Sequence, residues 1–98
     1  MENIFPSVVQ AVAGEDFTVY AYMLDGTIRL YDAKPLIARG GVFEALKNED
    51  FFKERLTVLN DTVAWDLSGN GDPAECIDID PFTLESCPEV SDRLKEIS

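Results

Sequence analysis

The sequence predicts an α+β fold, an antiparallel β-meander of about five strands with short helices packed on one face. Short β-rich runs, several of them alternating between apolar and polar residues, occur in the first third of the chain and again after its middle. Between them, residues 34–56 carry apolar side chains at the three- and four-residue steps of an amphipathic helix. The chain has 98 residues, 46% of them hydrophobic, which is enough to form a single hydrophobic core. We therefore expect a single domain over residues 1–86 and a helical extension of it over residues 87–98.

The strand-like runs follow one another closely enough to form hairpins. They occupy residues 3–13, 17–24, 27–32, 56–61, 62–66 and 76–80. Asp25-Gly26 stands between two of these runs and is typical of a two-residue type I′ turn, since glycine tolerates the positive φ that this turn needs. The runs LTVLND and TVAWD predict a second hairpin that turns at Asn60-Asp61.

The helical segment is predicted to divide into two short helices. Gly40-Gly41 would open the first, and Asn48-Glu49-Asp50 can end it and cap the second. Its apolar stripe is expected in the core and consists of Phe43, Leu46, Phe51 and Phe52.

A last helix is expected to begin near Pro88, because proline fits the first turn of a helix. Its stripe of Val90, Leu94 and Ile97 would either pack on the domain or meet a partner.

The chain is strongly acidic. It has 19 acids against 8 bases, a formal charge of -11 and a pI near 4.1. Its eight cations are scattered singly, so phosphate backbones are repelled and nucleic acid is not an expected partner of this chain alone. A basic protein is the natural complement. The start MENIFPSVVQAVAGED has neither a basic leader nor a long apolar run, so we expect a cytoplasmic protein without a membrane anchor.

The residues that commonly carry catalysis are sparse. Histidine is absent, which removes the usual proton shuttle, and no nucleophile or phosphate-binding motif is present. Asp78 and Asp80 alternate along one run and could form a carboxylate pair, but an Asp before a proline commonly starts a turn. Cys76 and Cys87 are expected to stay free thiols, a disulfide between them being the alternative. We therefore expect no enzyme and no cofactor.

The acidic stretch at residues 66–80, DLSGNGDPAECIDID, partly matches a calcium-binding loop. Asp66, Ser68, Asn70 and Gly71 stand where such a loop needs three oxygen ligands and its turning glycine. The match ends there, because Ile77 occupies the position of the bidentate glutamate. A turn rich in Gly, Asn and Asp explains the stretch better, and a small-ligand or metal-binding module using this loop stays as the alternative function.

Four motifs in order resemble the bacterial family of domain of unknown function 2442. They are DG-x-x-R-x-YD at residues 25–32, GVFEAL-x(4)-FF at residues 41–52, TVAW at residues 62–65 and CIDIDPFTLE at residues 76–85. The resemblance implies an α+β fold. For many members it also implies a neighbouring gene that encodes a small toxin-like protein, so the chain is expected to be the antitoxin of a toxin–antitoxin pair.

A partner surface is expected on the acidic side of the chain. Its predicted rim consists of Asp66, Asp72, Asp78 and Asp80. Trp65 is a candidate apolar anchor for the partner, with packing in the core as the other interpretation. A homodimer through an exposed hairpin edge is a further option.

Two charged residues of the first hairpin have structural interpretations. Arg29 is expected to form a cross-strand ion pair, with an anion-binding role as the alternative. Asp32 is expected to cap a turn or to pair with Arg29 or Arg39.

Overall fold

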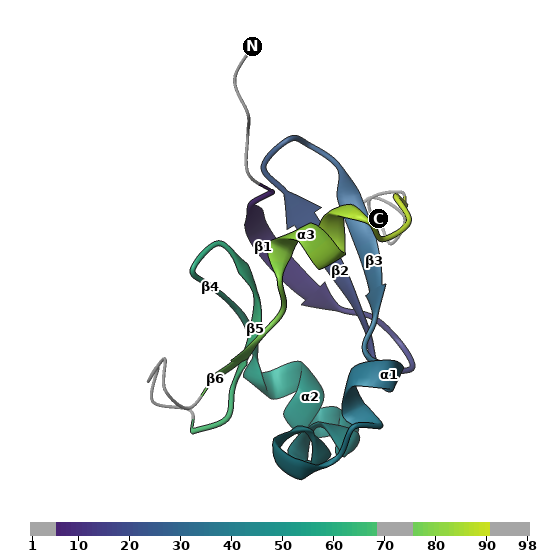
Figure 1. The fold of residues 1–98 in the computed structure, drawn as a ribbon, viewed down its shortest axis with the longest axis vertical. Coiled ribbons are helices and arrows are strands. Elements are labelled where there is room, and N and C mark those ends of the chain that lie inside the picture. Colours follow the sequence, from purple (N-terminus) through teal and green to yellow (C-terminus); the bar gives the residue numbers. More distant parts are fainter. Residues whose placement is uncertain (1–5, 69–75, 91–98) are drawn as a thin grey trace.

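The computed structural model describes residues 6–68 and 76–90, and it arranges six strands in two antiparallel sheets of three strands each (Figure 1). The first sheet has the order β1-β2-β3 and the second the order β4-β5-β6. The strands are β1 (Val8–Ala13), β2 (Thr18–Met23), β3 (Ile28–Asp32), β4 (Leu56–Leu59), β5 (Thr62–Asp66) and β6 (Cys76–Asp78). The α+β class is confirmed, but the single meander of about five strands is replaced by two sheets.

The long helical connection explains the division into two sheets. It leads from β3 through α1 (Lys34–Ile37), the 3₁₀ helix η1 (Gly41–Lys47) and α2 (Glu49–Arg55) before β4 begins. A connection of this length cannot close a hairpin between β3 and β4. The second sheet instead lies beside β1, where the Val8 backbone N–H donates to the Asp61 carbonyl at 2.8 Å.

The predicted type I′ turn occurs in the second hairpin rather than the first. Asn60 and Asp61 both have positive φ, 52° and 65°, as a type I′ turn requires. In the first hairpin only Gly26 has positive φ, and the Met23 carbonyl accepts from its N–H at 3.0 Å, which gives a three-residue loop. The Asp25 carboxylate explains the longer loop, because it accepts from both the backbone N–H and the hydroxyl of Thr27.

The predicted division of the helical segment is confirmed. η1 begins at Gly41 after Gly40, and both glycines have positive φ. Asn48 caps α2, since its side-chain oxygen accepts from the Phe51 N–H at 3.1 Å. The single turn α1 was not predicted, and neither was α3 (Pro81–Glu85), which packs against β3.

Both sheets and the helices contribute to one core. The ring of Phe52 lies between those of Phe17 and Trp65, at centroid distances of 5.3 Å each. Of the predicted helical stripe, Leu46 and Phe52 are fully buried, and the two other phenylalanines pack against the core.

Residues 88–90 run alongside the outer edge of β3 and do not begin a helix. The Leu30 N–H donates to the Pro88 carbonyl at 3.0 Å, and the Val90 N–H donates to the Ile28 carbonyl at 2.8 Å. The prediction of a helix from Pro88 is therefore wrong for these residues. No named strand lies beside this edge of β3 in the described part of the chain. An extended conformation lets residues 88–90 form hydrogen bonds with the backbone groups that this edge exposes. Leu94 and Ile97 of the predicted stripe lie outside the described residues.

Candidate functional site

A groove of about 370 Å³ separates α1 from the segment that joins β6 to α3. One wall comes from β3, α1 and the residues after it, and the other wall from the end of β6 and the start of α3. Its lining residues are Tyr31, Pro35, Leu36, Arg39, Asp78, Ile79, Asp80 and Thr83. The lining thus combines apolar side chains, Pro35, Leu36 and Ile79, with charged ones, Arg39, Asp78 and Asp80.

The end of β6 presents two carboxylates to this groove. Ile77 and Ile79 are buried, whereas Asp78 and Asp80 between and after them are exposed, as the alternation of a strand requires. The Asp80 carboxylate also accepts from the Phe82 N–H at 2.9 Å and caps α3. The expectation that the aspartate before the proline starts a turn is therefore confirmed.

The opposite wall carries one cation and one phenol. The Arg39 guanidinium lies over the ring of Phe43, 5.9 Å from its centroid. Burial raises the pKa of Tyr31 above that of a free phenol, and the opposing effect of the Arg39 charge is smaller. The phenol therefore stays protonated at neutral pH. Tyr31 can therefore donate as well as accept a hydrogen bond.

The carboxylates of the groove have no cationic partner within the part of the chain that the structure describes. None of the ion pairs found there involves Asp78 or Asp80. Arg39 also makes no ion pair in these residues, although it lines the same groove. Among the described residues that line the groove, two negative charges therefore lie opposite one positive charge.

The other predicted acids do not join this groove. Asp66 is half-buried at the end of β5, its carboxylate accepts from the Ser68 hydroxyl at 3.1 Å, and it lines a separate hollow beside Arg55. Asp72 lies outside the described residues, as do Asn70 and Gly71 of the calcium-loop pattern. Within residues 6–68 and 76–90, no group of three or more acidic, cysteine or histidine side chains is arranged to hold a metal ion.

Trp65 is a core residue and offers no surface to a partner in this structure. Its side chain is 0% exposed, and it packs against Phe52. The interpretation as a core residue is confirmed, and its placement on a partner surface is corrected. The reason is its position inside β5, where four consecutive residues are buried between neighbouring elements.

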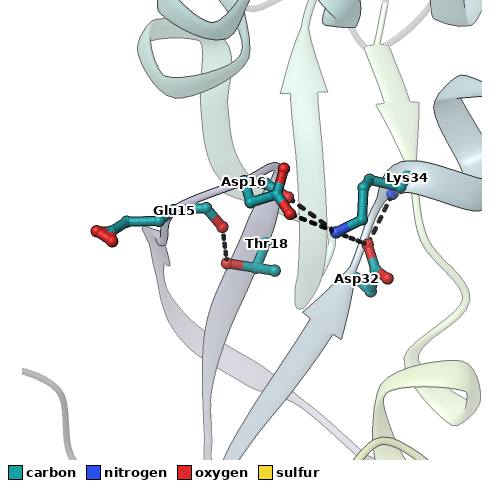
Figure 2. A network of polar contacts seen from close by, with 5 residues as sticks. All are labelled: Glu15, Asp16, Thr18, Asp32 and Lys34. Atoms are coloured by element: carbon teal, nitrogen blue, oxygen red, sulfur yellow. Dashed lines mark hydrogen bonds and ion pairs between the residues drawn. The ribbon is translucent and has the colours of Figure 1, made fainter.

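A polar network around Lys34 connects neighbouring loops and has a structural role (Figure 2). Lys34 itself was not predicted from the sequence as a residue of interest. The Lys34 ammonium lies 3.0 Å from the Asp32 carboxylate and 3.2 Å from that of Asp16. The Lys34 backbone N–H also donates to Asp32, which lowers the pKa of that carboxyl group. The Asp32 carboxylate thus caps the turn that leads into α1, as expected, but its ionic partner is neither Arg29 nor Arg39. The network ties the β1–β2 turn to the β3–α1 junction.

Arg29 holds the C-terminal segment and does not pair with a carboxylate within the described residues. Its guanidinium donates to the Cys87 carbonyl at 3.0 Å. This contact helps to place residues 88–90 against β3. The expected cross-strand ion pair is thereby corrected.

Cys76 and Cys87 do not form a disulfide bond with each other. Burial raises the pKa of Cys87, and its thiol donates to the Thr83 carbonyl. A thiol with a raised pKa is a poor nucleophile at neutral pH.

Sequence reasoning named Asp78 and Asp80 but missed the other wall of the groove. Tyr31 stands in the motif DG-x-x-R-x-YD, and Thr83 stands in CIDIDPFTLE. Membership of Tyr31 and Thr83 in these motifs could have marked them as candidates, but it does not indicate that they lie at one groove. Arg39 and Leu36 belong to no quoted motif, and only the fold brings them there.

The comparisons with known proteins find one family. The family model described as "Protein of unknown function (DUF2442)" matches residues 8–86, which covers every residue that lines the groove. No curated protein and no solved structure matches the chain. Along the residues that the structure describes, no helix is long and apolar enough to cross a membrane.

Proposed function

The chain belongs to the DUF2442 family of proteins of unknown function, and we propose that it is a binding module that recognises a basic protein partner through the groove between α1 and the β6–α3 segment. The observation that carries the proposal is the pair of exposed carboxylates of Asp78 and Asp80, which form no ion pair among the described residues and line the groove together with apolar side chains.

The charge of the whole molecule supports a basic partner. At -11 the protein repels anionic ligands and attracts cationic surfaces over distances set by the Debye length. Charges at the rim of an interface mainly accelerate association, whereas apolar contacts set the residence time. The groove offers both, since Pro35, Leu36 and Ile79 line it together with the carboxylates.

The partner we propose is a small toxin-like protein encoded next to this chain, which makes the chain its antitoxin. The resemblance described above supports this choice, and the acidic groove is compatible with it. Binding rather than catalysis is proposed, because the groove holds no histidine or cysteine that could act on a substrate.

Co-expression tests the proposal. The tagged chain is produced together with the product of the adjacent gene, and both co-purification and growth are followed. We expect the two proteins to co-purify and the chain to relieve growth arrest caused by the neighbour. A neighbour that neither binds at low salt nor arrests growth would sink the proposal.

A matched pair of double variants locates the interface. Asp78→Asn with Asp80→Asn removes both carboxylates of the groove while asparagine retains the cap of α3. Glu15→Gln with Glu54→Gln removes the same charge from two exposed residues elsewhere on the surface. The groove variant is expected to weaken binding by about tenfold, since each charge pair contributes about 0.2–1 kcal/mol. The control is expected to bind nearly as wild type.

A further inference from the structure

Among the residues that the structure describes, one edge of β6 has no strand beside it. It is the last strand of its sheet, and within the described residues it pairs only with β5. An unpaired edge exposes a row of backbone N–H and C=O groups that another chain can pair with.

The register shows which backbone groups face outward. Ile79 directly follows β6, and its N–H donates to the Val63 carbonyl at 3.0 Å. Ile79 therefore directs its backbone groups toward β5. Outward and inward groups alternate along an antiparallel strand. With Ala64 opposite Asp78, the backbone N–H and C=O of Asp78 therefore point away from β5. Asp78 also lines the groove, whose far wall is α1.

The side chains at this edge specify what a further strand would need. A residue paired with Asp78 would lie on the same exposed face, with its Cβ about 4.5–5.5 Å from that of Asp78. A basic side chain there would meet Asp78 and Asp80, which lack a cationic partner in the described residues. The flanking residues of the added strand would point to the opposite face, where Ile77 and Ile79 are buried.

We propose that the groove binds an extended segment of the partner, which adds to β6 as an antiparallel strand and alternates basic with apolar side chains. The inference rests on the proposed function and specifies how the partner is recognised. In this mode of recognition the main-chain hydrogen bonds provide affinity and the alternating side chains provide specificity. A second copy of this chain is a poor occupant, since each copy carries a charge of -11.

A synthetic peptide tests the inference with the full chain. The probe is acetyl-Thr-Val-Lys-Val-Lys-Val-Thr-amide, and binding is measured by calorimetry at low salt. A second peptide carries N-methyl groups on the backbone nitrogens of both lysines, which would face β6. The control peptide carries them on the two valines that flank the first lysine, whose nitrogens would face away.

The expected result has two parts. Methylation at the lysines weakens binding by about tenfold or more, whereas methylation at the valines has a smaller effect, because only the former removes hydrogen bonds to the edge. The unmodified peptide also slows hydrogen exchange of the Asp78 amide in ¹⁵N-labelled protein and leaves that of the Glu15 amide unchanged.

The outcomes separate this inference from the proposed function. In one outcome, peptide binding depends on Asp78 and Asp80, both methylation patterns weaken it equally, and hydrogen exchange at Asp78 is unchanged. This outcome overturns strand addition but is consistent with recognition of basic partners. An unmodified peptide that does not bind overturns strand addition as well, while co-purification with the neighbour decides the function independently. Binding of the peptide without co-purification retains the strand-addition site and removes the toxin.

Discussion

Trp65 illustrates how a single residue can be interpreted in two ways from sequence. A lone tryptophan at the end of an apolar run fits a core and also an interface. The fold decides for the core, since the ring is fully buried against Phe52 and opposite Leu56 and Ile77 in neighbouring strands. Its position in the sheet, rather than its chemistry, makes the difference.

Removing the Trp65 side chain should therefore destabilise the protein strongly. Trp65→Ala is expected to lower the free energy of unfolding by about 3–5 kcal/mol, because it leaves a cavity in the core. Leu24→Ala is the control, since Leu24 is 63% exposed and its truncation should cost about 0.5 kcal/mol or less. Urea denaturation of both variants measures the difference. Similar values for the two would contradict the placement of Trp65.

The charge of Asp32 should contribute to stability only above acidic pH. Hydrogen bonds and the charge of Lys34 lower its pKa in the folded state, so the stabilisation is complete above the unfolded pKa of about 3.9 and is lost as the pH falls through the folded value. Asp32→Asn is expected to cost no more than about 1 kcal/mol at neutral pH, because the pair is exposed to solvent.

Urea denaturation at neutral pH and near pH 2 checks this dependence. The difference between wild type and Asp32→Asn should disappear at the lower pH. Glu15→Gln, a neighbouring acid that makes no ion pair among the described residues, is the control. A difference that is the same at both pH values would argue against an ionic role for Asp32.

Elements with strong local signals were predicted well. Asn48 ends one helix and caps the next, and Asn60-Asp61 forms a two-residue turn, because each depends on the side chains and backbone of a few adjacent residues. The C-terminal segment was predicted wrongly. Its periodicity favoured a helix from Pro88, but the segment pairs with the edge of β3 instead. The two are far apart in the sequence, since Arg29 and Cys87, which are in contact, are 58 residues apart. A partner so distant in sequence leaves no local trace.

Arg29 should hold this segment in place. Arg29→Met removes the guanidinium that donates to the Cys87 carbonyl while retaining an apolar stem of similar length. We expect faster hydrogen exchange of the Leu30 and Val90 amides, both of which bond across this edge, and little change at Val19 in the centre of the sheet. Lys47→Met is a control at an exposed cation. Unchanged exchange at Val90 in Arg29→Met would show that the backbone pairing alone suffices.

The arrangement of the whole molecule explains why half of the groove escaped prediction. Asp78 and Asp80 were recognisable from their alternation and from the proline that follows. Tyr31 and Arg39 lie about 40 or more residues earlier in the sequence. They line the same groove because the second sheet packs beside β1 and α3 packs against β3. The sequence indicated an acidic surface and the carboxylate pair, but only the fold places Tyr31 and Arg39 at the same groove.

Recognition of a basic partner at the groove is tested by the rate at which the neighbouring gene product associates with wild type and with the Asp78→Asn, Asp80→Asn variant, measured at low and at high salt. We expect slower association of this variant at low salt, and a smaller difference from wild type at high salt, where these charges are screened. The Glu15→Gln, Glu54→Gln control should follow wild type. Equal rates for the groove variant and the control would contradict recognition of a basic partner at this groove.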